Sequence, residues 1–94
     1  MTVDELRSEL EKIVSSLVSA GFGSIDSGII DNLNKLAVTS DELGMKEGKR
    51  LIENLTGKMK EIQEGKAQAE SGDVRLMALD FYVKNISDGN TEDL

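Results

Sequence analysis

The stretch MKEGKRLIENLTGKMKEIQEG, residues 45–65, carries the most regular pattern in this sequence of 94 residues. Its apolar residues recur at intervals of three and four, the spacing that places side chains on one face of an α-helix. This face consists of Met45, Gly48, Ile52, Leu55, Met59 and Ile62, and Leu51 flanks it. Gly65 follows the last turn of the pattern, so we predict a helix that begins near Met45 and stops at Gly65.

Two glycines lie inside this predicted helix. An internal glycine makes a helix less stable by about 1 kcal/mol relative to alanine. Gly48 lies on the apolar face, so we expect a neighbouring helix to approach closely there. Gly57 lies off that face, and we interpret it as a mild weakness in the helix.

Residues 3–20 show a second helical pattern, with apolar residues again at intervals of three and four. Thr2 and Glu5 have the spacing of a capping box, in which each side chain accepts a hydrogen bond from the backbone N–H of the other residue. Gly21 suits the residue just past a helix end. We therefore predict a helix over about residues 3–20.

The segment between Gly23 and Gly44 predicts another helix, which ends at Leu43. It begins at Ser24 or Ser27, since three residues there are suitable N-caps, namely Ser24, Asp26 and Ser27. Residues 38–40 are poor helix formers, so a kink near Thr39 or a separate short helix capped by Ser40 is the alternative to one continuous helix.

A last helix is predicted from near Ser71 to residue 86. Its main apolar positions are Leu76, Leu79, Val83 and Ile86, and further apolar residues are Val74, Met77, Phe81 and Tyr82. The apolar arc is wider than in the other helices. Phe81 and Tyr82 are adjacent, so they cannot both point toward one core.

Strand patterns are absent from the sequence, which lacks sustained alternation of apolar and polar residues. Four amphipathic helices with short links predict an all-α fold, an antiparallel up-down-up-down four-helix bundle. We expect one domain over residues 1–87 and an acidic flexible tail over residues 88–94.

Composition excludes several kinds of chemistry. The chain has no cysteine and no histidine, so a thiolate nucleophile, a disulfide, an imidazole base and a His-containing zinc site are all excluded. Serines are plentiful but have no histidine to activate them, and no lysine lies on an apolar face. We expect no catalytic residues, no cofactor and no metal, and therefore a protein that is not an enzyme.

The net charge of the chain limits the kinds of partner that it can bind. Eighteen acidic against eleven basic residues give a net charge of −7, which disfavours direct binding to nucleic acid and to anionic membranes. Met1 is followed by Thr2-Val3-Asp4-Glu5 rather than by basic and apolar residues, so we expect no signal peptide and a cytoplasmic location. The apolar runs are too short to span a membrane.

Four large side chains are candidates for contact with a protein partner, namely Phe22, Met45, Phe81 and Tyr82. Large apolar groups at helix ends and on an over-wide arc are typical of protein interfaces. The alternative is that all four complete a small core.

The function that fits these features is a non-enzymatic helical module that binds a protein partner or associates with itself. One alternative is a bundle with inward-facing carboxylates that binds a metal or another ligand. Another is an acidic regulator of a nucleic-acid-binding protein.

Leucines and glycines along the chain also carry a family resemblance, in the segments Leu17…Ala20-Gly21-Phe22, Leu33…Leu36-Ala37, Glu42-Leu43-Gly44-Met45 and Leu51-Ile52…Leu55. From Ile13 to Ile86 the chain resembles a helical segment of some large bacterial proteins that also contain SWIM-type zinc fingers. The resemblance implies an accessory helical module. This chain lacks the Cys and His ligands of that zinc finger, so no metal or DNA-binding role carries over. The predicted bundle also looks like a histidine phosphotransfer domain, without its histidine.

Overall fold

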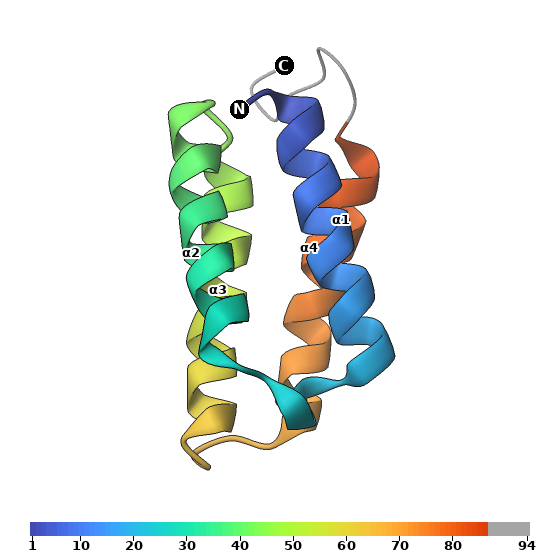
Figure 1. Cartoon of the computed structure of the whole chain (residues 1–94), viewed down its shortest axis with the longest axis vertical. Helices are drawn as coiled ribbons and strands as arrows, with labels where there is room; N and C mark the ends of the chain where they lie inside the picture. Colours follow the sequence, from blue (N-terminus) through green and yellow to red (C-terminus); the bar gives the residue numbers. More distant parts are fainter. Residues whose placement is uncertain (87–94) are drawn as a thin grey trace.

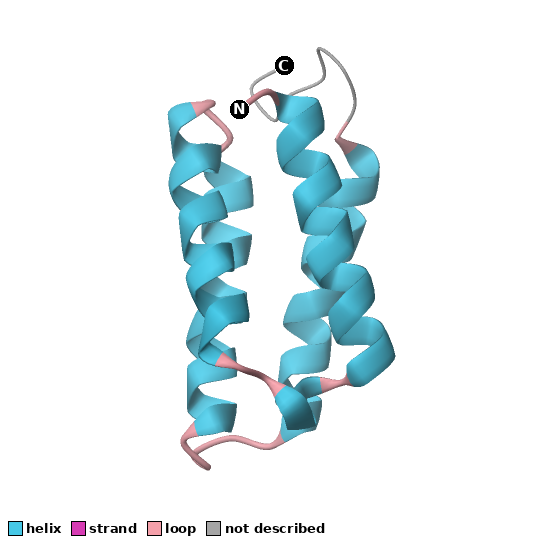
Figure 2. Cartoon of the chain, in the orientation of Figure 1, coloured by secondary structure: helices cyan, strands magenta, loops and turns pink. Residues whose placement is uncertain are grey.

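The computed structural model describes residues 1–86, and the regular structure of this part of the chain is entirely helical (Figures 1 and 2). The elements are α1 (Val3–Ala20), η1 (Phe22–Ser24), α2 (Ser27–Glu42), α3 (Lys46–Gln63), η2 (Ala69–Gly72) and α4 (Asp73–Asn85). The all-α prediction with four helices is confirmed. The expected acidic tail, 88–94, lies outside the described residues.

Side chains cap the first two helices as the sequence predicts. The Glu5 N–H donates to Thr2 Oγ1 at 3.1 Å, and the Thr2 N–H donates to Glu5 Oε1 at 2.9 Å, which completes the capping box. Hydrogen bonding from Thr2, chiefly from its backbone N–H, lowers the pKa of Glu5 because it favours the carboxylate form. Among the three N-cap candidates of α2, Asp26 is the one used, and its Oδ1 accepts from the Ile29 N–H at 2.9 Å.

Glycines end α2 and α3 through the same hydrogen-bond pattern, the Schellman motif. After α2, the Gly44 N–H donates to Asp41 O at 3.0 Å and the Met45 N–H to Ser40 O at 2.8 Å. After α3, the Gly65 and Lys66 N–H groups bond to the carbonyls of residues 62 and 61. Gly44 and Gly65 have φ angles of +79° and +75°. Residues with a Cβ atom rarely adopt such angles, whereas glycine does so readily. The predicted helix stops are therefore confirmed.

Helix α2 is continuous through the weak segment at residues 38–40. Thr39 Oγ1 donates to Lys35 O at 3.1 Å, so its hydroxyl is satisfied within the helix. Ser40 starts no new helix. It lies inside α2 and is fully buried.

Each helix contacts the next one along the chain, and α1 also contacts α4 (Figure 1). The most extensive packing is between α2 and α3. Buried side chains from all four helices form one core, which contains Leu6, Leu10, Val14, Leu17, Phe22, Ile30, Leu33, Leu36, Ala37, Met45, Ile52, Leu55, Met59, Leu76, Leu79, Val83 and Ile86. No helix in residues 1–86 combines the length and the apolar character needed to cross a membrane.

Two short 3-10 turns, which the sequence analysis did not predict, bring the α1–α2 and α3–α4 connections together. Phe22 in η1 packs directly on Gly72 in η2, where a Cβ atom would lie 2.9 Å from the phenylalanine ring. Phe22 is only 4% exposed. The absence of a side chain at Gly72 thus makes room for Phe22 at this end of the molecule.

Gly48 in α3 permits a close approach, as its place on the apolar face predicts. It is buried, and a Cβ atom there would lie 3.0 Å from the Tyr82 ring and hydroxyl of α4 and 3.2 Å from Ser40 Oγ of α2. Side chains from two neighbouring helices therefore occupy the space beside this glycine.

Ser40→Ala is expected to raise the free energy of unfolding by about 1 kcal/mol. The Ser40 hydroxyl is buried, and within residues 1–86 it has no hydrogen-bond partner. The replacement therefore removes an unsatisfied polar group. Urea unfolding of Ser40→Ala beside Ser15→Ala, an exposed position on α1, separates this effect from the gain in helix propensity. Equal gains in the two variants would contradict the prediction.

Candidate functional site

Helix α4 is apolar on two opposite sides. Leu76, Leu79 and Val83 point into the core and are at most 5% exposed. Three other large side chains recur at intervals of three and four on the outer side, and Val74, Met77 and Phe81 are 71%, 70% and 72% exposed. Ala78 lies among them and is also exposed. We refer to Val74, Met77, Ala78 and Phe81 as the outer stripe of α4.

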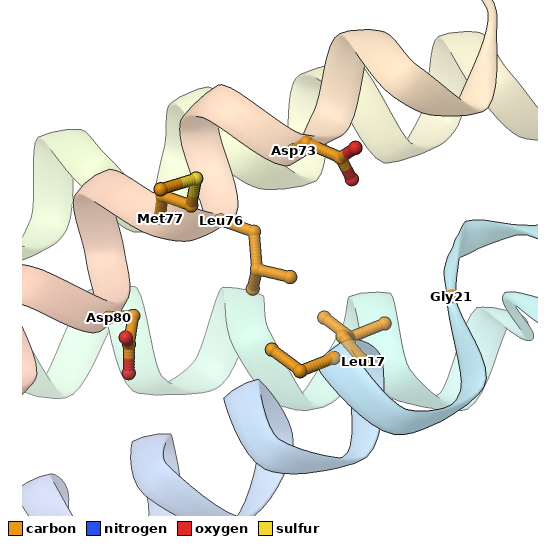
Figure 3. Close-up of a pocket in the computed structure, with 7 residues that line it drawn as sticks. Leu17, Gly21, Asp73, Leu76, Met77 and Asp80 are labelled. Atoms are coloured by element: carbon orange, nitrogen blue, oxygen red, sulfur yellow. The ribbon is translucent and has the colours of Figure 1, made fainter.

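A pocket of about 250 Å³ lies between α1 and α4, next to the outer stripe (Figure 3). Leu17 and Leu76 extend from their two helices toward the space between them, and Met77 joins the pocket to the stripe. Val18 of α1 also lines the pocket, and it is 68% exposed. The full lining consists of Leu17, Val18, Gly21, Asp73, Leu76, Met77 and Asp80.

Two carboxylates give this apolar pocket a charged edge. Figure 3 shows Asp73 and Asp80 on either side of Leu76 along α4. Asp80 forms an ion pair with Lys84, with 2.9 Å between Oδ2 and Nζ. Asp73 is exposed and forms no ion pair or side-chain hydrogen bond with any residue of the described chain. The pocket edge therefore has one carboxylate without an ion pair, Asp73, and one that is paired with a surface lysine, Asp80.

The four predicted partner-contact residues lie in different environments. Phe22 and Met45 are 4% and 1% exposed, so both belong to the core of this chain. Tyr82 is half-buried beside Gly48. Phe81 is exposed on the outer stripe. The structure thus brings Phe81 together with Val74 and Met77, and it leaves Phe22 and Met45 inside.

The sequence pattern included Val74 and Met77 among the apolar residues of the last helix and did not identify Asp73 or Asp80 as site residues. The width of the apolar arc on the last helix is the signal that pointed to a second apolar side. It did not show which side faces the core, because that depends on the positions of the other helices.

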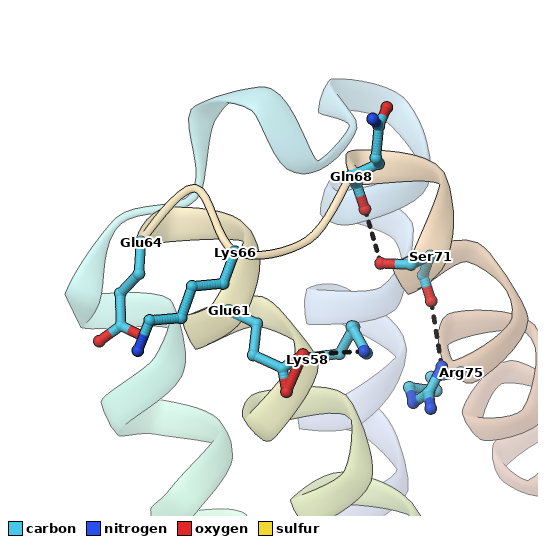
Figure 4. Close-up of polar contacts among 7 residues, drawn as sticks. All are labelled: Lys58, Glu61, Glu64, Lys66, Gln68, Ser71 and Arg75. Carbon is cyan, nitrogen blue, oxygen red and sulfur yellow. Dashed lines mark hydrogen bonds and ion pairs between the residues drawn. The ribbon is translucent and has the colours of Figure 1, made fainter.

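A second group of polar residues lies at the corner between α3 and α4 (Figure 4). Lys58 Nζ contacts Glu61 Oε1 at 2.9 Å, and this ammonium group lowers the pKa of Glu61 by favouring its carboxylate form. Ser71 Oγ donates to Gln68 O at 2.6 Å, and Arg75 Nη1 donates to Ser71 O at 3.2 Å. Each of these contacts joins residues three or four positions apart, so each stabilises its own helical turn.

In the part of the chain that the structure describes, carboxylates do not gather into a metal site. Within residues 1–86, no three acidic side chains lie close enough together to hold an ion. Several exposed acidic residues take part in ion pairs along single helices, such as Arg7 with Asp4 and with Glu11, both at 3.6 Å. Such exposed pairs contribute about 0–1 kcal/mol each to stability.

Comparison with known proteins gives no significant match to a family model, a curated protein or a solved structure. The resemblance to a segment of SWIM-type zinc-finger proteins therefore stays a prediction. The function of this chain has to be inferred from its own surface, above all from the outer stripe of α4 and the adjoining pocket.

Proposed function

We propose that this chain is a non-enzymatic interaction module that binds a protein partner through the outer stripe of α4. The supporting observation is that Val74, Met77 and Phe81 are each at least 70% exposed on one side of a helix whose other side is buried. Burying apolar surface contributes about 25 cal/mol per Å². Phenylalanine and methionine are also enriched in the buried centres of protein interfaces.

We also propose that the four helices form an up-down-up-down antiparallel bundle. Contacts between consecutive helices, the contact of α1 with α4, and the short connections support this arrangement. In such a bundle one side of each helix faces the common core and the other faces outward. A partner that packs on α4 would then add to the outside of the bundle and leave its core intact.

Photo-crosslinking tests the proposed interface. A benzophenone amino acid at Phe81 is expected to give a crosslinked product of defined mass in the cells that naturally make the chain. The same probe at Asn32, an exposed position on α2, serves as the control and is expected to give little product. Circular dichroism checks that both variants are folded. Equal crosslinking at the two positions, or none at Phe81, would overturn the proposal.

A further inference from the structure

We infer that the segment docking on α4 is a basic amphipathic helix, which places an apolar side chain in the α1–α4 pocket and cations beside Asp73 and Asp80. This inference rests on the proposed interaction function and names the chemistry of its partner. It draws on the pocket lining, the exposed stripe and the charges at the pocket edge, taken together.

The pocket and the stripe together accept an apolar helix face. Leu17 and Leu76 provide apolar walls between α1 and α4, while Met77 belongs both to the pocket and to the exposed side of α4. A helix that lies along a groove of this kind inserts side chains that recur at intervals of three and four. One bulky residue of the partner would enter the pocket, and the apolar residue next to it in sequence would pack on the outer stripe of α4 at Met77.

Asp73 and Asp80 set the spacing of the cations. They lie seven residues apart on α4, which corresponds to about two helical turns and about 10 Å along the axis. Leu76 and Met77 lie between them in the chain, beside the pocket. A partner helix parallel or antiparallel to α4 would therefore carry lysine or arginine at positions i and i+7, with its apolar anchor at i+3 or i+4.

The charges favour a cationic partner. Asp73 forms no ion pair within residues 1–86. An incoming ammonium or guanidinium group could therefore pair with its carboxylate without displacing another cation. Asp80 already contacts Lys84, whose side chain is 70% exposed and can be displaced. The net charge of −7 adds a long-range attraction for basic partners.

A second copy of this chain fits the same surface less well. A two-fold interface would place the same patch on both subunits, so the carboxylates of the two copies would meet around an already acidic molecule. Stable dimers also bury about 800 Å² on each partner. An exposed stripe of Val74, Met77, Ala78 and Phe81 is closer in size to the footprint of one helix.

The test uses a designed alanine-rich peptide helix with lysines at i and i+7 and leucines at i+3 and i+4. Its affinity for the full chain is measured by fluorescence anisotropy and is expected to fall as salt rises. A scrambled peptide of the same composition is expected to bind about tenfold more weakly, since it has no apolar face. Equal binding of the two peptides would overturn the inference.

Variants of the chain separate local contacts from general attraction. Asp73→Asn with Asp80→Asn is expected to weaken binding about tenfold, whereas Asp31→Asn with Glu53→Gln, a pair of exposed residues on α2 and α3, should change it by less than about twofold. Lys84→Gln should strengthen binding about threefold, because it frees Asp80 and removes a repulsive charge. Equal weakening by both double variants would mean that only net charge matters, which would overturn the inference.

The outcomes distinguish this inference from the function on which it rests. Crosslinking at Phe81 without any peptide binding would keep the interface and overturn the basic helix as its occupant. Failure of both would overturn both proposals. A dimer in sedimentation equilibrium that Phe81→Ser converts to a monomer would identify a second copy as the occupant, and would overturn the inference in the same way.

Discussion

Phe22→Ala is expected to lower the free energy of unfolding by about 3–5 kcal/mol, the cost typical of removing a buried phenylalanine. Phe22 is 4% exposed and packs against Gly72, so its ring joins η1 to η2 at one end of the molecule. Domains of this size have a total stability of about 5–15 kcal/mol. The variant would therefore lose a large part of its stability, and thermal and urea unfolding would both show it.

Phe81→Ala is the matched control, because Phe22 and Phe81 are the two phenylalanines of the chain. Phe81 is 72% exposed, so its removal should change stability by no more than about 0.5 kcal/mol. The same variant should weaken partner binding. If both replacements cost the same stability, either the Phe22 ring contributes little to the packing of η1 on η2 or the outer stripe of α4 is covered within the folded chain.

The ends of the helices could be predicted from the sequence because their causes are local. The capping box of Thr2 and Glu5 involves residues three positions apart, and the glycine stops at Gly44 and Gly65 involve hydrogen bonds within one turn. The burial of Phe22 has a different origin. It depends on Gly72, fifty positions later in the chain, and on a 3-10 turn with no strong sequence pattern.

The candidate site could be predicted only in part, for a related reason. A wide apolar arc on the last helix indicated a surplus of apolar residues, and among the four candidates for partner contact Phe81 is the exposed one. Met77 and Leu79 are two positions apart and similar in character, yet one is 70% exposed and the other is fully buried. Their different environments follow from where α1 and α3 pack on α4, which periodicity within one helix does not specify.

The internal glycines of α3 allow a sharper test of packing than any single replacement, because both lie inside the same helix. Gly57→Leu is expected to raise the free energy of unfolding by up to about 1 kcal/mol, since leucine favours helix far more than glycine does. Gly57 is exposed, and a Cβ atom there would meet nothing within 4 Å. The added side chain would project into free space beside the helix.

Gly48→Leu is expected to lower the free energy of unfolding by about 1–3 kcal/mol, despite the same gain in helix propensity. Its Cβ alone would lie 3.0 Å from Tyr82 and 3.2 Å from Ser40 Oγ, so a leucine must displace the tyrosine ring or push α3 away from α4. Urea unfolding of the two variants measures the difference between them, in which the propensity term cancels. A stabilised Gly48→Leu would mean that Tyr82 moves aside freely, and that the close approach of α3 and α4 at this point contributes little to the fold.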